Sequence, residues 1–413
     1  MSTIFIQIAS YRDPQLVPTL DDCISKAKFP ENLRFGIAWQ HGPEENLDKY
    51  KDDKRFSIVD IPYGESQGAC WARNQIQQQY NGETYTLQLD SHHRFIQDWD
   101  AELINMLEGL RSETCKKPLL TSYISSWDPD NDPAGRVNRP WGMNFDRFTP
   151  EGIVFFLPAD IPNHDSLDTP VRARFYSAHF CFADGKFAEE VQHDPEYYFH
   201  GEEISISVRS FTHGYDLFHP HKIIAWHEYT RKGRTKHWDD DKNWHVRNAK
   251  CHKRNRILLG MEEDSDNIDF GKYGLGKERT IKDYEKYAGI SFEKRAVQQY
   301  TLDKEYPPNP NYDIEEDYQN SFLKIFRHCI DIQYNQVPEN DYEFWVVAFQ
   351  GEDGEDIFRK DADKNEINRM MTDPDKYCKI WREFNAEALP KKWVVWPYSK
   401  SKGWCNAIIS NIT

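Results

Sequence analysis

Short apolar runs separated by amphipathic segments predict an α/β sheet in the first 110 residues of the chain. Four runs of strand-like composition lie at residues 3–10, 33–40, 56–63 and 84–90. Segments with apolar side chains at helical spacing lie at residues 19–29, 70–80 and 99–110. We expect Thr19 to cap the first helix and Pro30 to lie beyond its end. Such alternation of strands and helices is typical of a parallel sheet.

The pattern becomes mixed between about residues 115 and 230. Strands are expected at residues 117–125, 152–161 and 221–231, with a strand pair inside 175–191. The stretch 126–142 is rich in Pro, Asp, Gly and Asn, which is typical of a loop. Helices are expected over residues 201–215, where Gly214 ends the first, and over residues 242–260.

Short runs rich in Trp and Val return near the C-terminus. They lie at residues 342–350, 391–398 and 405–412 and predict a small β-rich module whose indoles pack against one another. A polar region precedes them. We therefore predict three parts, an α/β domain over residues 1–235, a polar and partly helical extension over 236–320, and a β-rich C-terminal module over 321–413.

Composition excludes several classes of protein. With 13 Trp, 22 Tyr and 24 Phe, the chain is too aromatic to be disordered. Its formal net charge of -16 repels phosphate backbones, so we expect no nucleic-acid partner. No run of 18 apolar residues occurs and no signal-peptide pattern opens the chain, so we expect no membrane association and a cytoplasmic location. The eight cysteines are scattered without a CxxC, as is typical of buried thiols in a reducing compartment.

The fourth expected strand ends in an unusual polar group, Asp90-Ser91-His92. Side chains two apart at a strand end share a face, so a carboxylate and an imidazole can point at one ion. A mixed oxygen and nitrogen pair suits Mn²⁺ better than Ca²⁺, with Mg²⁺ as the alternative, and would leave positions open for a diphosphate. The competing interpretation is that Asp90 caps the loop and His92 is simply exposed.

Three arginines are predicted at the same edge of the sheet. Arg12 follows the first strand, Arg73 lies on the helix of residues 70–80, and Arg94 follows the Asp-Ser-His group. Guanidinium groups bind phosphates in a bidentate fashion, although each of these could instead be a surface cation. No GxGxxG or Walker A motif opens a helix, which disfavours a dehydrogenase or a P-loop NTPase. A zinc site made of His237, His245, Cys251 and His252 is disfavoured because the spacing fits no usual pattern.

Three motifs in order carry a resemblance to a known family. "SYRD" after the first strand, "GACWARN" at a helix start and "DSHHRF" at a strand end resemble the GT-A glycosyltransferases. They look most like the enzymes that add N-acetylglucosamine to a hydroxyproline of Skp1, over about residues 3–237. The resemblance implies a GT-A-like α/β fold, a divalent cation, a UDP-GlcNAc donor and a protein or peptide acceptor. It also implies nucleotide-sugar contacts from Ser10, Tyr11, Arg12, Arg73, Asn74, Asp90 and Ser91.

A second segment is similar to the polypeptide N-acetylgalactosaminyltransferases. In residues 182–209, Gly201-Glu202 opens a helix and an Arg follows seven residues after the Glu. Those enzymes take a third metal ligand from a His four residues before an Arg, which implies a metal set of Asp90, His92 and His227, with Arg231 as the Arg. The resemblance implies catalytic-site roles for Glu202 and Glu203, contacting donor sugar or acceptor, and retention of anomeric configuration.

The chain differs from these relatives at some positions, and two other functions compete with this interpretation. Glu203 stands where the relatives have Asn, and Ser205 where they have Glu, so acceptor recognition is not carried over. Carboxylates in the first turn of any helix also favour its dipole. Two other functions stay open, a metal-dependent phosphoesterase that activates water with the same residues, and a non-catalytic carbohydrate-binding protein that uses the Trp-rich module. Release of phosphate from simple esters, or metal-independent glycan binding, would distinguish them.

Overall fold

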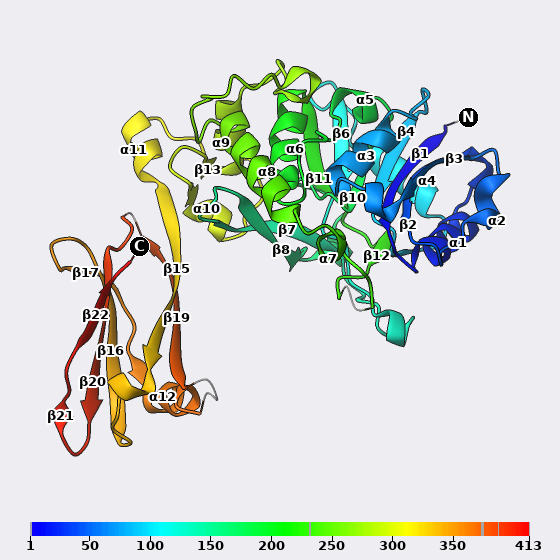
Figure 1. Cartoon of the computed structure of the whole chain (residues 1–413). Coiled ribbons are helices and arrows are strands. Elements are labelled where there is room, and N and C mark those ends of the chain that lie inside the picture. The colour runs from blue at the N-terminus through cyan, green and yellow to red at the C-terminus, as the bar shows by residue number, and fades with distance from the viewer. Residues whose placement is uncertain (1, 231–232, 373–375, 387, 413) are drawn as a thin grey trace. The chain divides into compact units, whose positions relative to one another are not determined.

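The chain folds into two compact units in the computed structural model, which describes residues 2–230, 233–372, 376–386 and 388–412. Unit 1 comprises residues 1–293 and 300–311, and unit 2 comprises residues 294–299 and 312–413. Figure 1 labels the helices and strands of both units. No helix within the described ranges is long and apolar enough to cross a membrane.

Unit 1 is built on an eight-stranded sheet of order β3-β2-β1-β4-β10-β6-β11-β9 (Figure 1). Its strands are β1 (Ile4–Tyr11), β2 (Leu33–His41), β3 (Phe56–Pro62), β4 (Tyr85–Leu89), β6 (Lys117–Thr121), β9 (Val171–Arg172), β10 (Phe180–Asp184) and β11 (Tyr215–His219). β10 runs antiparallel to β4 and β6, and β9 antiparallel to β11, while the remaining pairs are parallel. The sheet is therefore mixed, whereas we predicted a parallel one.

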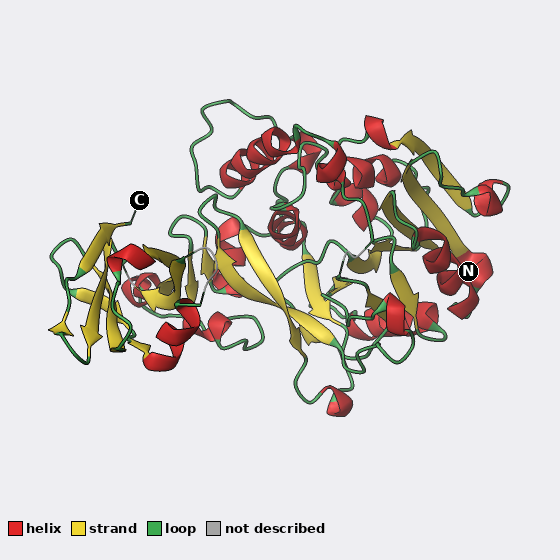
Figure 2. Ribbon diagram, turned by 60° about the horizontal axis from the view of Figure 1, so that its bottom comes forward, coloured by secondary structure: helices red, strands yellow, loops and turns green. Residues whose placement is uncertain are grey.

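Helices cover both faces of this sheet, as Figure 2 shows. One face packs on α1 (Leu16–Lys26) and α4 (Trp99–Leu110) through a core that includes Ile6, Leu87 and Phe180. The other face packs on α3 (Ala69–Gln77) and α6 (Glu202–Thr212) through two smaller apolar clusters. Alternate residues of one strand face opposite sides of a sheet, so β10 contributes to both cores.

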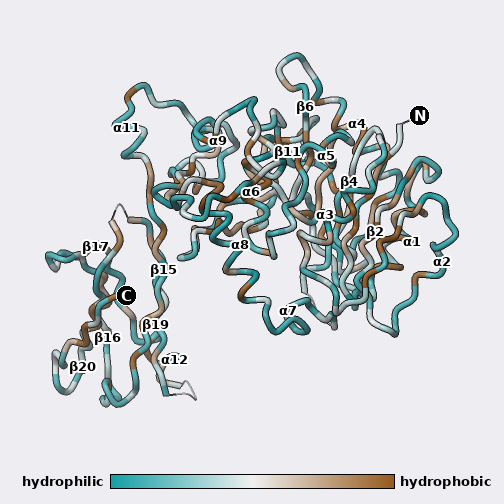
Figure 3. Tube along the Cα trace, turned by 45° about the horizontal axis from the view of Figure 1, so that its top comes forward, coloured by the Kyte–Doolittle hydropathy of each residue, from teal (hydrophilic) through white to brown (hydrophobic). Residues whose placement is uncertain are grey.

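The remaining elements of unit 1 are short or peripheral. β5 (His93–Phe95) pairs with β12 (Ala225–His227), and β7 (Trp141–Phe148) pairs with β8 (Val154–Asp160). The other elements are α2 (Asp48–Lys51), α5 (Phe187–Glu190), α7 (His237–Asp240), α8 (Trp244–Leu258), α9 (Ile281–Ala288) and β13 (Ile290–Ser291); α10 (Gln299–Leu302) lies at a unit boundary. In Figure 3 the short helices α2 and α7 are mostly hydrophilic.

Several local predictions for unit 1 were wrong. Thr19 does not cap α1 but lies inside it, where its buried hydroxyl donates to the Ser91 carbonyl at 2.9 Å and accepts from the His93 amide at 2.9 Å. The expected strand pair within 175–191 is β10 followed by α5, and the expected loop at 126–142 contains the start of β7. Tertiary contacts set the secondary structure of these segments, because each segment is too short for its local sequence pattern to determine that structure.

Unit 2 consists of two antiparallel sheets around one core. The first sheet contains β14 (Ala296–Gln298), β15 (Phe322–Gln333) and β19 (Tyr377–Ala386). The second contains β16 (Tyr342–Gln350), β17 (Asp356–Arg359), β18 (Ala362–Asp363), β20 (Lys392–Ser399), β21 (Gly403–Trp404) and β22 (Ile408–Asn411); the unit's helices are α11 (Glu315–Asn320) and α12 (Lys364–Met370). The predicted β-rich C-terminal module is confirmed.

The indoles of unit 2 are divided between its interior and its surface. Trp345 and Trp393 are buried in the core, as predicted. Trp396 is 41% exposed, so the expectation that the indoles bury one another was wrong for this residue. Trp381 and Trp404, outside the predicted runs, are 62% and 49% exposed. Trp396 and Trp404 instead contact each other on the outside of the second sheet, with ring centroids 4.5 Å apart.

Candidate metal centre

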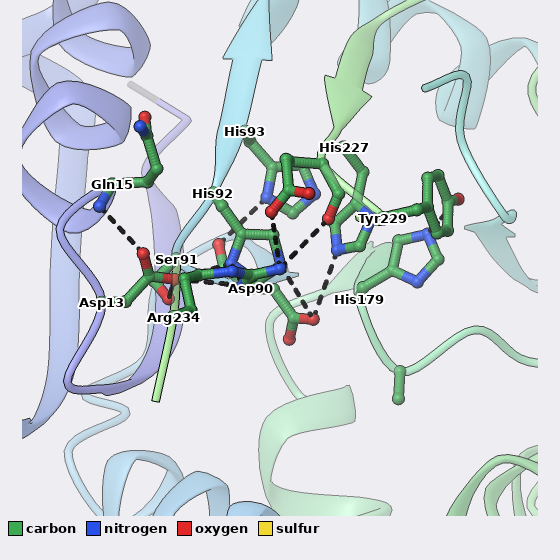
Figure 4. A network of polar contacts seen from close by, with 12 residues as sticks. Asp13, Gln15, Asp90, Ser91, His92, His93, His179, His227, Tyr229 and Arg234 are labelled. Atoms are coloured by element: carbon green, nitrogen blue, oxygen red, sulfur yellow. Dashed lines mark hydrogen bonds and ion pairs between the residues drawn. The ribbon is translucent and has the colours of Figure 1, made fainter. Parts of the chain in front are cut away.

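The predicted metal ligands come together where β4 ends. Asp90 and His92 follow this strand directly, and the next residue opens β5, which pairs with β12 so that His93 lies opposite His227. The His227 amide donates to the Ser125 carbonyl at 2.9 Å, which holds its backbone in place. One ligand atom from each of Asp90, His92 and His227 lies within 4.8 Å of the other two (Figure 4).

The ring of His92 is oriented by a buried carboxylate. Asp13 Oδ2 lies 2.7 Å from His92 Nδ1, and the Ser91 hydroxyl donates to the same oxygen at 2.7 Å (Figure 4). An Nδ1–H donated to Asp13 leaves the ring's lone pair on Nε2, which lies 3.8 Å from Asp90 Oδ2 and 3.0 Å from Nη1 of Arg234. Metal-binding histidines usually donate their second nitrogen to such a partner.

Asp90 is held as a carboxylate. Arg73 Nη2 donates to its Oδ1 at 2.9 Å, and His227 Nε2 lies 3.4 Å from its Oδ2. Burial acts to raise the pKa of Asp90, but its contact with His227 and the charge of Arg73 outweigh burial and hold that pKa well below its usual range. A carboxylate that stays ionised is the form that binds a cation.

The imidazole of His227 is held in its neutral form. Burial lowers the pKa of His227 well below its usual range, and burial does the same to the neighbouring His179. Neutral imidazole is the ligand that metals require. One carboxylate and two imidazoles therefore fit a divalent cation of the Mn²⁺ type, and three protein ligands leave coordination positions open.

Glu202 and Glu203 open α6 and point into the protein. Arg73 Nη1 donates to Glu202 Oε1 at 3.0 Å, and the Cys70 thiol donates to the other oxygen. Burial raises the pKa of Glu202, while Arg73 opposes the rise. Glu203 accepts from the Tyr123 hydroxyl at 2.6 Å and from a backbone amide at 3.0 Å, and burial raises its pKa to about 7. Their four oxygens are thus bonded to protein groups.

A cavity of about 360 Å³ opens beside the three ligands. Of the residues expected to contact a nucleotide sugar, those in its wall are Tyr11, Arg73, Asp90 and Ser91. Ser10 is fully buried behind the wall. Asn74 is also buried, and its amide donates to the His193 carbonyl at 2.8 Å.

Of the three arginines, Arg73 lines this cavity and Arg12 and Arg94 do not. Arg73 is engaged with the two carboxylates described above. Arg12 pairs with Glu44 at 3.2 Å and with Asp240 at 3.1 Å, so it is neutralised by surface carboxylates. Arg94 lies over the Trp127 ring at 4.2 Å. Besides Arg73, the wall of the cavity contains the cationic residues Arg234 and Lys236.

Arg234 is a residue that the sequence did not single out. Its Nη1 lies 3.0 Å from His92 Nε2 and 3.3 Å from Asp13, and its Nη2 pairs with Glu228 at 2.6 Å (Figure 4). It therefore brings a permanent positive charge to the ligand cluster. The signal was the basic run at residues 233–236 that follows the His227 strand. Arg231, expected four residues after His227, lies outside the described residues.

Two other residues of the cluster were not expected at the metal centre. Asp13 belongs to the "SYRD" motif, but only Ser10, Tyr11 and Arg12 of that motif were predicted to contribute to the site. His179 carries no local signal, since it precedes an ordinary apolar strand. The disfavoured zinc set of His237, His245, Cys251 and His252 forms no ligand group in the described part of the chain.

Similarity to known proteins is clearest at the level of family. The family described as Glycosyltransferase (GlcNAc) matches residues 3–52 and 43–294, which is more than half of the 413-residue chain. No curated protein sequence matches the chain.

Two solved structures are similar in fold. The crystal structure of GalNAc-T7 with UDP, GalNAc and Mn²⁺ has a TM-score of 0.50 and 12% sequence identity, and the match covers 100% of this chain and 72% of that chain. The crystal structure of S. aureus TarS 1-349 in complex with UDP-GlcNAc has a TM-score of 0.39 and 10% identity, over 65% of this chain and 68% of that chain. The first similarity confirms the predicted GT-A-like α/β fold.

Proposed function

The chain belongs to the Glycosyltransferase (GlcNAc) family, and on that premise we propose that it transfers N-acetylglucosamine from UDP-GlcNAc with the help of a divalent cation. The observation that carries the metal dependence is the group formed by Asp90, His92 and His227 in the wall of a cavity. When bound there, Mn²⁺ would supply positive charge to the departing diphosphate. Mg²⁺ is the alternative ion.

Each group of side chains around the cavity has a role in the proposed reaction. Asp90, His92 and His227 hold the cation, while Arg234 and Lys236 add positive charge that favours a diphosphate over a neutral ligand. Tyr11 and Ser91 line the space for the nucleotide sugar. Glu202 acts through Arg73, which it shares with Asp90, rather than by contacting the substrate.

The transfer that this arrangement supports is a front-face displacement with retained anomeric configuration, as the family resemblance implies. The bond between the sugar C1 and the diphosphate oxygen breaks, and a bond from C1 to the acceptor oxygen forms on the same face. The proton of the acceptor hydroxyl passes to the leaving diphosphate. Both Glu202 and Glu203 have their oxygens bonded within the protein, which fits a reaction without a carboxylate nucleophile.

The acceptor in this proposal is a hydroxyl group of a protein or peptide. Hydroxyproline in a Skp1-like protein is the first candidate, on the resemblance of the "SYRD", "GACWARN" and "DSHHRF" motifs. The departures at Glu203 and Ser205 bear on acceptor recognition more than on the donor. The acceptor is therefore tested separately from the donor.

A donor panel tests the proposed function. The purified protein is incubated with Mn²⁺ and either UDP-GlcNAc, UDP-GalNAc or UDP-glucose, and UDP release is measured with and without a hydroxyproline peptide. A peptide with proline in place of hydroxyproline is the matched control. We expect preferential turnover of UDP-GlcNAc and a mass increase of one N-acetylhexosamine on the hydroxyproline peptide alone.

Each part of the proposal can fail independently. Turnover of UDP-GlcNAc without modification of either peptide would remove the hydroxyproline acceptor and keep the donor. Preferential turnover of UDP-GalNAc would replace the donor sugar. No turnover of the three donors, together with phosphate release from simple esters, would favour the phosphoesterase instead.

A further inference from the structure

The two histidine ligands of the candidate metal centre are held in different ways. The ring of His92 has a carboxylate partner for its second nitrogen, since Asp13 Oδ2 lies 2.7 Å from Nδ1. The ring of His227 has Nε2 turned toward Asp90, but its buried Nδ1 has no hydrogen-bond partner among the described residues. A metal-binding histidine normally has such a partner, which sets the plane of its ring. Something else must orient His227.

The His227 ring is instead held by contacts with neighbouring rings. The His179 ring lies on the His227 ring with centroids 4.2 Å apart and planes 20° apart, as Figure 4 shows. The Tyr229 ring meets the edge of His227 at 4.4 Å and 70°. The face contact and the edge contact together restrict rotation of the imidazole about its Cβ–Cγ bond. Rotation in either direction would bring the imidazole into collision with one of these two rings.

His179 is itself fixed from several sides. Its Nδ1 lies 3.2 Å from the Ser177 hydroxyl, and its Nε2 lies 3.1 Å from the Tyr229 hydroxyl. The Tyr229 hydroxyl donates to the Ile124 carbonyl at 2.7 Å, so this contact is tied to the backbone. The side chain of His179 is buried. A ring held on both nitrogens and buried is a rigid surface for another ring to lie on.

A third ring also stacks on His179. Tyr123 stacks on it with centroids 5.1 Å apart and planes 27° apart. The Tyr123 hydroxyl donates to Glu203 at 2.6 Å, and Glu203 also accepts from the Ala178 amide at 3.0 Å. Glu203 therefore anchors both a ring of the stack and the residue before His179. This gives Glu203 a structural partner, in contrast to the substrate contact that the sequence suggested.

We propose that His179 is the positioning residue for the metal ligand His227, whose ring plane it sets by stacking in place of a hydrogen bond to Nδ1. The inference rests on the metal dependence of the proposed function. His179 does not have to touch metal or substrate in this role. Tyr123 stacks on His179, and Glu203 anchors Tyr123 and the Ala178 amide.

The test compares metal binding in substituted forms of the full-length protein. Mn²⁺ is titrated and its free ion is followed by electron paramagnetic resonance, and Co²⁺ is added separately to record its visible absorption, which reports ligand geometry. We expect His179→Ala to weaken Mn²⁺ binding on the order of tenfold and to change the Co²⁺ spectrum. His179→Phe keeps a ring to stack on and should restore Mn²⁺ affinity to within about threefold of wild type.

A matched control separates stacking from loss of a buried histidine. His219 is 4% exposed and its ring nitrogens contact Thr121 and Met143 instead of the ligands, so His219→Ala should leave Mn²⁺ affinity and the Co²⁺ spectrum unchanged. Should His179→Ala fail to fold, Tyr229→Phe supplies a milder variant, because it removes the hydroxyl at 3.1 Å from His179 Nε2 and keeps the ring. It should weaken Mn²⁺ binding by about threefold.

The outcomes distinguish this inference from the function on which it rests. A folded His179→Ala protein with wild-type Mn²⁺ affinity and an unchanged Co²⁺ spectrum would overturn the positioning role and leave the metal centre intact. Equal losses in His179→Ala and His179→Phe would also overturn it, since a hydrogen bond rather than stacking would then matter. Absence of Mn²⁺ binding by the wild-type protein would overturn the metal dependence and this inference together.

Discussion

Unit 1 buries a network of charged side chains at the end of its sheet, whereas unit 2 exposes several of its tryptophans. In unit 1, Arg73 is buried at the end of the sheet between two carboxylates, with side-chain exposures of 5% for Arg73 and 8% for Glu202. In unit 2, Arg382 is equally buried but pairs with a single carboxylate, that of Glu366. Other ion pairs such as Arg359–Asp361 lie at the surface, with side-chain exposures of 51% and 35%, and three of the tryptophans are exposed. Burying charge is costly unless it is paired, so a fold retains it where chemistry requires it. An arginine shared by two carboxylates lies beside the candidate metal centre only in unit 1 of the described structure, and with the family match over residues 3–294 this assigns the chemistry to unit 1.

Replacement of one metal ligand should have the largest effect. We expect Asp90→Asn to weaken Mn²⁺-dependent UDP binding by at least about 100-fold, because the amide cannot supply the anionic oxygen. The measurement is calorimetric titration of UDP in the presence of Mn²⁺. Asp361→Asn makes the same change in unit 2 and should leave UDP binding unaltered. Equal UDP affinities in the two variants would remove Asp90 from the metal centre.

Replacement of the buried arginine Arg73 should have the largest effect on stability. Arg73→Met leaves Asp90 and Glu202 without their shared partner and should lower the free energy of unfolding by about 3–5 kcal/mol. Arg359→Met removes the exposed pair of unit 2 and should cost at most about 1 kcal/mol. Urea denaturation followed by circular dichroism measures both. Similar costs for the two variants would contradict the contrast between the units.

The pH dependence of stability tests the burial of Glu203. Its pKa is about 7 in the folded protein, above the ordinary value of 4.5, so the native state keeps a proton that the unfolded chain loses between these values. This stabilising contribution is fully present below about pH 4.5 and is lost as pH rises through 7. Relative to Glu203→Gln, the wild-type free energy of unfolding should fall by on the order of 3 kcal/mol across that window. The free energies of unfolding of both proteins are measured against pH in EDTA. Wild-type and Glu203→Gln curves that run parallel would show that Glu203 does not titrate in this pH range.

The smallest effect is expected at the surface of unit 2. Trp396 is 41% exposed and contacts Trp404, so Trp396→Ala should cost no more than about 1 kcal/mol of stability. UDP binding with Mn²⁺ should be unchanged, since the chemistry is assigned to unit 1. Reduced UDP affinity in a folded Trp396→Ala protein would show that unit 2 contributes to the donor site.

The sequence predicted those parts of the site that depend on local pattern. The apolar run of β4 ends at Leu89, so the position of Asp90 and His92 at a strand end followed from the alternation alone. The helix that begins after Gly201 was also predicted, and Gly201 adopts φ 101°, which favours glycine there. His227 was reached through resemblance, because its pairing with β5 joins segments more than 130 residues apart.

Other features could not be predicted because they are tertiary. Nothing local indicates that Arg73 bonds Glu202 across the protein or that His179 stacks on His227. In unit 2, β19 was missed although its burial alternates along its whole length. Trp381 faces outward and Arg382 faces inward, where it pairs with Glu366 at 2.7 Å, so the hydrophobic pattern of this strand is inverted at its centre.

The central claim is that unit 1 binds a nucleoside diphosphate through a cation held by Asp90, His92 and His227. Calorimetric titration of UDP into the purified protein, first with Mn²⁺ and then with EDTA, tests it most directly. We predict saturable UDP binding with Mn²⁺ and a loss of that binding in EDTA. Equal UDP affinity in both conditions would contradict the metal centre, and no binding in either would contradict the donor site.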